Sequence, residues 1–156
     1  MSAVEDRLAE LSLSVPEVVP PVAAYVPAVR QGNLVFTSGQ LPMAGGSMAA
    51  TGKVGEGAGL VAPDVAKELA QACALNAIAA VKALIGDLDQ VARVVKVVGF
   101  VASHPDFTGQ PGVVNGASEL LGKAFGEAGV HARSAVGVAA LPLDAPVEVE
   151  IIVALD

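Results

Sequence analysis

Apolar and polar residues alternate most clearly near the end of the chain, where residues 147–153 read Val-Glu-Val-Glu-Ile-Ile-Val. A period of two is the pattern of a β-strand with one apolar and one polar face. Glu148 and Glu150 therefore stand together on the face opposite the apolar one. A second strand-like run begins near Arg133, and a proline-containing loop over residues 141–146 separates the two runs.

An earlier pair of strand-like segments surrounds a short polar turn. Residues 23–30 and 34–38 are the candidate strands, and residues 31–33, Gln-Gly-Asn, lie between them. The glycine and the asparagine both tolerate positive φ, which tight hairpin turns require. We therefore expect a β-hairpin, whose second strand leaves at Gly39, where the missing side chain lets a ligand approach the backbone.

A long apolar strand is predicted in the second half of the chain, over residues 91–103. Strict alternation puts Val95, Val97 and Val101 on one face and Val94, Val98 and Phe100 on the other. A strand that is apolar on both faces is covered on both faces. This segment is therefore predicted to need a cover on each side of its sheet.

Three segments are predicted to be helices. Residues 63–85 begin at a proline and are followed by a glycine, and residues 112–128 end at Gly129. The second of these has an apolar stripe made of Val114, Ala117, Leu121, Ala124 and Phe125. A shorter helix is expected over residues 2–11, where Ser2 can cap the first turn.

Prolines and glycines mark the irregular segments. Prolines at positions 16, 20 and 21 predict an extended linker. Residues 1–20 are therefore interpreted as an N-terminal helix and Pro-rich linker, and residues 21–156 as the main domain. Six glycines fall within residues 44–60 and predict a flexible loop, with a short strand near Met48 as an option.

The order of these elements, β-β-(β)-α-β-α-β-β, predicts an α+β domain of two layers, with two helices on one face of a mixed sheet. Apolar residues make up 53% of the 156 positions but aromatic residues only 3%, so Ala, Val, Leu and Ile must form the core. A single small domain has too little interior for so much apolar surface. The second face of the sheet is therefore expected to be buried between subunits of an oligomer.

Charge and cysteine content exclude several classes of protein. The formal net charge is −7 and no run of Lys and Arg occurs, whereas a nucleic-acid surface needs a basic footprint. Cys73 is the single cysteine, so no disulfide framework is expected. The acidic N-terminus does not resemble a signal peptide, and no apolar run is judged to approach the ~20 residues of a membrane helix. The sequence thus predicts a cytoplasmic protein without membrane or nucleic-acid partners.

One polar constellation lies on the predicted strands. Arg133 is followed on the same strand face by Ala135 and Gly137, and such small residues leave room for a ligand beside the guanidinium. A guanidinium stays charged and binds a carboxylate through two N–H groups at once. A solvent-facing arginine on an edge strand would show the same pattern. Glu148 and Glu150 compete for the role of the nearby acid, and a solvated strand face also explains both.

The remaining candidates have equally plain structural explanations. His104 and His131 are far apart in the sequence and are interpreted as surface residues, so no metal site and no cofactor are predicted. Tyr25 fits a half-buried strand aromatic as well as it fits a ligand contact. Asn115 falls where a residue of the first helical turn would lie.

Several short motifs, in their order and spacing, resemble those of the YjgF/RidA family. They are Ala24-Tyr25-Val26, the run from Gly32 to Pro42, Val114-Asn115, Ala132-Arg133-Ser134-Ala135-Val136, and Leu141-Pro142 followed by Val147-Glu148-Val149-Glu150. The resemblance covers residues 21–155. It implies a chorismate-mutase-like α+β fold and a homotrimer with three clefts between its subunits.

The resemblance also implies a chemistry. Characterised enzymes of this family hydrolyse reactive enamines and imines, such as 2-aminoacrylate and 2-iminopropionate, to 2-keto acids and ammonia, without metal or cofactor. By resemblance, Arg133 binds the substrate carboxylate and Glu148 holds or activates the water. Five further residues are implied to line the cleft: Tyr25, Ser38, Gly39, Asn115 and Ala135.

Two other functions stay open at this point. The first is a trimer that binds a small carboxylate as a sensor or regulatory ligand without turning it over. The second is an endoribonuclease, a role reported for some members, which the acidic charge of this chain disfavours.

The chain differs from the family pattern at four places. Many members have cysteine at the position of Ala135 and a larger polar residue at that of Gly137. Both changes alter the pocket wall and leave the natural substrate open. The loop before the first long helix is longer than usual, and the N-terminal helix is an addition.

Overall fold

The computed structural model describes every residue of the chain except Val22. The described part contains three α-helices: α1 (Ala3–Glu10), α2 (Pro63–Ile85) and α3 (Gln110–Phe125). Its strands are β1 (Ala28–Gln31), β2 (Leu34–Thr37), β3 (Met43–Ala44), β4 (Ser47–Met48), β5 (Val91–Ala102), β6 (Ala132–Val138) and β7 (Val147–Leu155). Three 3₁₀ turns complete the structure: η1 (Leu88–Gln90), η2 (Gly126–Gly129) and η3 (Pro142–Asp144).

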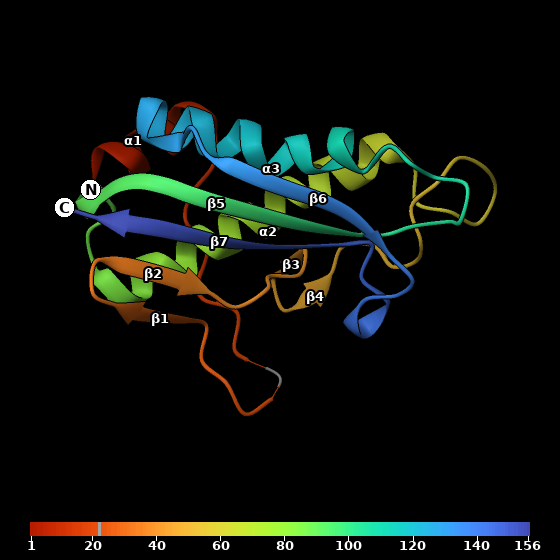
Figure 1. The fold of residues 1–156 in the computed structure, drawn as a ribbon, viewed down its shortest axis with the longest axis horizontal. Coiled ribbons are helices and arrows are strands. Elements are labelled where there is room, and N and C mark those ends of the chain that lie inside the picture. Colours follow the sequence, from red (N-terminus) through yellow and green to blue (C-terminus); the bar gives the residue numbers. More distant parts are fainter. Residues whose placement is uncertain (22) are drawn as a thin grey trace.

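Five strands form one mixed sheet in the order β1-β2-β7-β5-β6, and β3 and β4 form a separate small hairpin (Figure 1). β7 runs antiparallel to both β2 and β5, whereas β6 runs parallel to β5. The last two strands of the chain therefore lie on either side of β5 and do not pair with each other. The simple hairpin that their spacing in the sequence allows does not form.

Helices α2 and α3 cover one face of this sheet (Figure 1). α2 packs on β7, and α3 packs on β5 and β6. The apolar set of β7 points toward the helices and is buried, as the alternating pattern predicts: Val147, Val149, Ile151 and Val153. The predicted two-layer α+β fold, with two helices on one face, is thereby confirmed.

The predicted assignment of faces along β5 is wrong. Its pairing with β7 shifts just after Val94, so Val94 and Val97 both lie on the helix side and are buried. Val95 is 37% exposed, whereas Val101, which was grouped with it, lies in the core. An irregularity in the pairing reverses the alternation of side chains beyond it, and periodicity alone cannot locate such a position.

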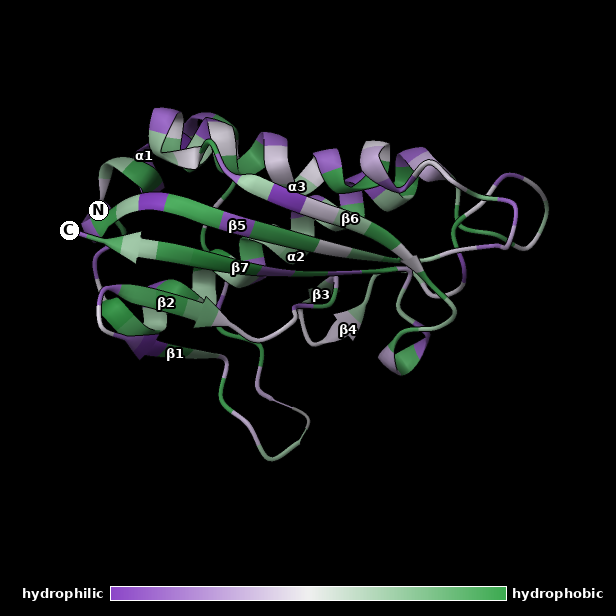
Figure 2. Ribbon diagram, in the orientation of Figure 1, coloured by the Kyte–Doolittle hydropathy of each residue, from purple (hydrophilic) through white to green (hydrophobic). Residues whose placement is uncertain are grey.

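The face of the sheet away from the helices is called the open face. It is formed by Val29, Phe36, Lys96, Val98, Phe100, Val136, Glu148, Glu150 and Ile152. Val29, Phe36 and Val136 are 50%, 37% and 44% exposed. In Figure 2 most of β2, β5 and β7 is coloured hydrophobic, although no helix covers this side. Exposed apolar side chains gathered on one face in this way mark an interaction surface.

Several element boundaries differ from those predicted. β1 begins at Ala28, not at residue 23, because Pro27 has no N–H to donate to a neighbouring strand. Gln31 pairs with Leu34, so the turn is only the pair Gly32-Asn33, with Gly32 at φ +61°.

The predicted end of the second long helix also needs correction. α3 begins at Gln110, before the predicted start at residue 112, and ends at Phe125. Gly126 has φ +63° and stops it, because a glycine adopts this conformation without strain. The predicted stop, Gly129, ends the following turn η2 instead. The β3–β4 hairpin confirms a short strand near Met48.

The expectation that no apolar segment approaches the length of a membrane helix needs correction. α2 has 23 residues and a mean hydropathy of 1.4 in its most apolar stretch, which is long and apolar enough to cross a membrane by length and composition. However, 56% of that stretch is buried inside the protein. α2 is a core helix, packed against β7 on one side and against α3 on another.

The N-terminal helix α1 packs against α3 and shares the main core through Val4 and Leu8. Ser2 and Glu5 form a capping box that satisfies the first backbone N–H groups of the helix. Glu5 also accepts a hydrogen bond from Lys82 of α2. This bond and the one from the Ser2 backbone hold the pKa of Glu5 at about 2. Its negative charge therefore persists at all but very acidic pH.

Gly116 allows α3 to lie close to α2. A Cβ atom at Gly116 would stand 1.9 Å from the backbone oxygen of Lys67, an atom that cannot rotate away. The helices therefore meet through backbone contact at this point. Gly122, on the same helix, has nothing within 4 Å of the equivalent position.

These two glycines make a matched pair for a stability test. Gly116→Ala should destabilise the protein by ~1–3 kcal/mol, because the methyl group forces the helices apart. Gly122→Ala should instead stabilise it by about 0.5–1 kcal/mol, because alanine loses less backbone entropy in a helix. Denaturant unfolding of the two variants measures both values. Equal effects would contradict the close approach of α2 and α3 at Gly116.

Candidate functional site

Arg133 lies on β6 and points to the helix side of the sheet. Its partner in the pairing with β5 is the buried Val97. One terminal nitrogen, Nη1, donates to Asn115 Oδ1 at 2.7 Å and to Ser118 Oγ at 3.3 Å. The other, Nη2, donates to the Pro111 carbonyl oxygen at 3.3 Å. All three acceptors belong to α3, so the helix determines where the guanidinium lies.

This arrangement leaves part of the guanidinium able to bind a ligand. Arginine has five N–H donors in a planar group, and α3 takes three of them. Nε–H and one N–H of Nη2 remain, and no acceptor for them occurs among the described residues. Two N–H groups on one plane match the two oxygens of a carboxylate. The helix therefore orients Arg133 without neutralising it, since all three acceptors are uncharged.

Sequence reasoning missed Ser118 and misjudged His131. His131 is half-buried; its Nδ1 lies 2.6 Å from the Gly129 carbonyl oxygen and its Nε2 lies 2.9 Å from Ser118 Oγ. A carbonyl only accepts, so Nδ1 carries a proton, and when that is the only ring proton Nε2 accepts from the Ser118 hydroxyl. Ser118 Oγ can then accept from Arg133. Because Asn115 and Ser118 are three residues apart on α3, their shared face was the signal that could have found the pair.

The small residues after Arg133 do not leave an empty space within one chain. Ala135 and Gly137 follow it on the helix side, opposite Gly99 and Val101. Ala135 packs against the core. A Cβ atom at Gly137 would lie 2.7 Å from Gln110 Nε2 and 3.0 Å from Ser103 Oγ. Polar side chains therefore occupy the room that the sequence predicted for a ligand at this position.

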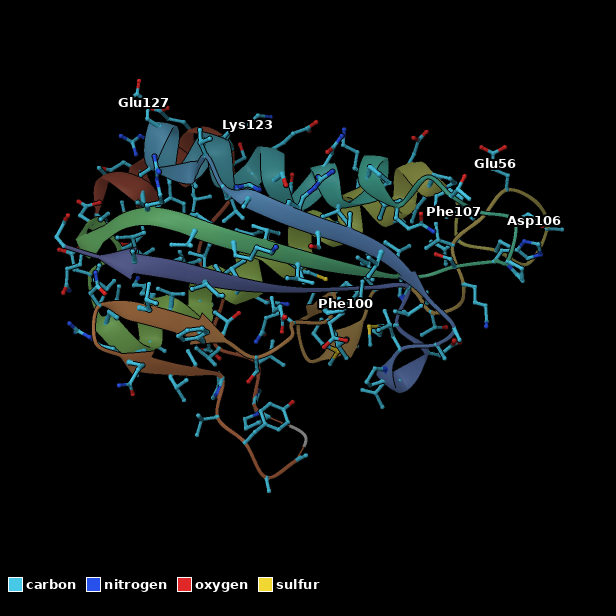
Figure 3. All side chains as sticks on the ribbon, in the orientation of Figure 1. Glu56, Phe100, Asp106, Phe107, Lys123 and Glu127 are labelled. Atoms are coloured by element: carbon cyan, nitrogen blue, oxygen red, sulfur yellow. The ribbon has the colours of Figure 1, made fainter. Side chains whose placement is uncertain are left out.

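Glu148 belongs to a second group of residues, on the open face. It pairs with Phe100 of β5, which is labelled in Figure 3. Its carboxylate leans against Gly39, where a Cβ atom would stand 1.9 Å from Oε1. A larger residue at position 39 would have to displace the Glu148 carboxylate. No hydrogen bond to the carboxylate occurs within the described part of the chain, so both oxygens can hold a water or a ligand.

Burial and charge both disfavour the ionised form of Glu148. Partial burial in the sheet raises the pKa of this carboxyl above its usual range, and the nearby negative charge of Glu150 raises it further. A carboxylate whose pKa is raised toward neutral pH is a better proton acceptor than an ordinary surface glutamate. The raised pKa of Glu148 therefore supports its role as the nearby acid, which the alternating sequence pattern left open.

The other implied residues surround the same end of the sheet. The Ser38 hydroxyl donates to the Val26 carbonyl oxygen at 2.7 Å and so ties the segment containing Tyr25 to the end of β2. Tyr25 and Gly39 line a cavity of about 650 Å³. Tyr25 is 45% exposed, so its ring is available to a ligand or to another chain.

The two groups of residues lie on opposite faces of the sheet. Arg133 and Asn115 are on the helix side, whereas Glu148 and Gly39 are on the open side. Strand β5 stands between β6 and β7, which adds roughly 10 Å of sheet between their backbones. Within one chain, Arg133 and Glu148 therefore cannot act on the same small molecule. Elsewhere in the described residues, no three His, Cys, Asp or Glu side chains gather as metal ligands do.

The chain is similar in sequence and structure to known proteins. The family model described as Endoribonuclease L-PSP matches residues 16–155. The crystal structure of Atu1372 from Agrobacterium tumefaciens, a protein of unknown function, is 46% identical in sequence with a TM-score of 0.89. The match covers 99% of this chain and 93% of that one, so it includes α1.

Two further solved structures carry informative names. The YjgF gene product of E. coli is 30% identical over 88% of this chain and 93% of its own, with a TM-score of 0.65. E. coli TdcF, solved with bound serine, is 27% identical over 91% of this chain and 94% of its own, with a TM-score of 0.60.

The influence of Glu150 on Glu148 can be measured directly. In Glu150→Gln the pKa of Glu148 should fall toward its ordinary value, because a neighbouring negative charge is removed. Carboxyl-carbon NMR titration of both proteins measures the shift. Glu119→Gln, an exposed change on α3, is the control and should leave the pKa of Glu148 unchanged. An unaltered Glu148 titration in Glu150→Gln would contradict the coupling.

Proposed function

The chain belongs to the YjgF/RidA family, and from that premise we propose that it hydrolyses 2-imino acids to 2-keto acids and ammonia. The observation that carries the proposal is the state of Arg133. Three uncharged acceptors hold it in place, and two N–H groups remain for a carboxylate. A carboxylate ligand also agrees with the serine bound to TdcF, since serine is an amino acid of similar size.

The proposed site requires more than one copy of the chain. The open face presents apolar side chains that water would otherwise contact, and the family resemblance implies a trimer whose subunits bury this face. A neighbouring subunit can then bring its Arg133 toward the group formed by Glu148, Gly39 and Tyr25. Because these groups lie on opposite faces of one sheet, a cleft between two copies is the arrangement in which they can meet.

The mechanism follows from the two charged groups. Arg133 of one subunit binds the carboxylate of the imino acid, which leaves the imine carbon facing Glu148 of the next. Glu148 takes a proton from a water as its oxygen bonds to that carbon, giving a tetrahedral carbinolamine. Glu148 passes this proton to the nitrogen, which makes the carbinolamine neutral. Glu148 then takes the remaining hydroxyl proton and passes it to the nitrogen, so that ammonia leaves as the C–N bond breaks and the C=O bond forms. No net oxidation occurs, and Glu148 ends ionised.

Attack of water on the imine carbon needs a base that is ionised and still basic enough to accept a proton. The raised pKa of Glu148 meets this need better than a fully solvated carboxylate does. Arg133 contributes mainly orientation, because it holds the reacting carbon at a fixed place relative to the base. Neither step needs a metal or cofactor, in line with the chemistry that the family resemblance implies.

Two alternatives remain distinct from this proposal. A trimer that only binds a small carboxylate would use Arg133 in the same way but would not need Glu148. An endoribonuclease, the activity in the name of the family model, would need to attract a polyanion. The net charge of −7 and the two carboxylates on the open face oppose that, because RNA binding depends on basic groups.

The role of Glu148 separates enzyme from binding protein. Glu148→Gln should lower kcat for 2-iminopropionate by ~10²–10⁴-fold while pyruvate still binds, since the amide cannot accept a proton. The variant should fold well at pH 7. When the pKa of a glutamate is higher in the folded state than in the unfolded state, ionising it lowers the stability of the protein. This loss develops as pH rises through the folded-state pKa, so replacing the charged group with a neutral amide does not weaken the fold.

Glu150→Gln is the matched control for this change. It should keep most of the activity, but the rise of kcat with pH should move to lower pH, following the pKa of Glu148. Steady-state rates across pH for wild type and both variants give the answer. Loss of activity in Glu150→Gln with normal rates in Glu148→Gln would show that the base is Glu150 and not Glu148.

The shared cleft can be tested by mixing two inactive variants. Arg133→Ala and Glu148→Gln should each be inactive alone, but mixed trimers contain clefts with an intact Arg133 from one subunit and an intact Glu148 from the next. Random assembly at equal amounts should restore about a quarter of the wild-type activity in the whole pool, and about a third in isolated mixed trimers, because one of their three clefts has both intact partners. Co-expression with two different affinity tags isolates the mixed oligomers. Purified mixed oligomers without activity would contradict a site divided between subunits.

A further inference from the structure

The cavity beside Tyr25 has a chemistry different from that of the Arg133 site. It lies between the linker that contains Val19 and the β3–β4 hairpin, and its volume is about 650 Å³. Other apolar walls come from Leu41, Met43 and Leu143. This volume is in the range of pockets that bind small molecules. Within one chain the cavity does not reach Arg133, so a molecule bound inside it would not contact the guanidinium of the same subunit.

Two buried amide side chains line this cavity, Gln40 and Asn76. They are only 6% and 3% exposed. Asn76 Nδ2 donates to the carbonyl oxygens of Leu41 and Met43, each at 3.0 Å. Gln40 Nε2 donates to the Ser38 carbonyl oxygen at 3.1 Å. These three carbonyl oxygens can only accept, so the NH₂ group of each amide must point toward them. The amide oxygen of each side chain therefore points away from these carbonyls.

The oxygens of these two amides are not fully enclosed by protein. Neither Gln40 Oε1 nor Asn76 Oδ1 has a hydrogen-bond donor among the described residues. No fully enclosed side-chain nitrogen or oxygen in the described part of the chain lacks a partner, so both oxygens must have open space beside them. The cavity that both residues line is that space. Acceptors held this deep in an apolar wall are unfavourable unless a donor reaches them.

The charge of the lining narrows the class of ligand. Among the described residues that line the cavity, Glu17 is the only charged one. Two amide oxygens and a carboxylate repel an anion, and no lysine or arginine is present to bind one. We infer that this cavity is a second binding site, for a small apolar molecule carrying an NH₂ or NH₃⁺ group that donates to Gln40 and Asn76. This goes beyond the proposed function, because binding here requires neither Arg133 nor turnover.

Three probes of one size test the inference: benzamide, benzylamine and benzoate. Benzamide and benzylamine carry donors, and benzoate carries only acceptors. NMR titration should shift the side-chain NH₂ signals of Gln40 and Asn76 with a donor probe and not with benzoate. Tighter binding of benzamide would identify a neutral ligand, and tighter binding of benzylamine a cationic one. Benzoate shifting these signals as strongly as both donor probes would overturn the inference.

Matched variants locate the binding. Gln40→Met removes one acceptor at nearly constant size and should weaken donor-probe binding roughly five- to tenfold. Gln110→Met is the control, because Gln110 lies outside the cavity and donates to Phe107 and Ser103. Equal affinities in the two variants would place the probe elsewhere.

Two further variants serve different purposes. One tests the cavity without changing a buried residue, and the other separates cavity binding from the proposed catalysis. Val19→Lys changes only the linker wall; it should weaken benzylamine binding and let benzoate enter the cavity. Arg133→Ala should leave benzamide binding unchanged. If the protein hydrolyses no imine but these binding results hold, the cavity stands and the proposed function fails. If imines are hydrolysed but no donor probe shifts Gln40 or Asn76, only the cavity inference fails.

Discussion

Side chains on neighbouring strands alternate between two faces, and in this protein helices cover only one of them. The rest of the structure depends on this constraint. The helix side takes the valines of β7 and most of those of β5 into a core closed by α2 and α3. The open side keeps apolar residues together with Glu148 and Glu150. Because each strand contributes to both faces, Arg133 and Glu148 are directed to opposite sides by nothing more than their positions in the pairing with β5.

The two charged groups are supported by very different surroundings. Arg133 is held by α3 through neutral acceptors, which orient a cation without removing its charge. Glu148 has no such partners among the described residues, and burial together with Glu150 makes its ionised form less favourable. One group is therefore stabilised in a single position, while the other is kept reactive. That contrast suits an anchor for a carboxylate and a base for a water.

The N-terminal part of the chain adds features beside this site. Helix α1 shares the core, and the proline linker forms a wall of the cavity near Tyr25 and Gly39. The cavity presents amide oxygens and apolar groups, whereas the Arg133 site presents N–H groups and a positive charge. The two sites therefore favour ligands of opposite hydrogen-bonding character, although Tyr25 and Gly39 belong to the surroundings of both.

The sequence alone determined the layers of the fold, because hydrophobic periodicity reports which face of an element is buried. The buried set on β7 follows directly from it, whereas the bounds of α2 follow from the proline that begins it and the glycine after it. It also pointed to Arg133 and Glu148, although the choice of Glu148 over Glu150 came from the family resemblance. What the sequence could not determine depends on contacts between distant segments. The pairing shift after Val94, the place of β5 between β6 and β7, and the hydrogen bonds from Arg133 to α3 arise only when these elements meet. Tertiary structure alone therefore decided that the two candidate catalytic residues lie on opposite faces, since periodicity describes each strand by itself and not its register with another.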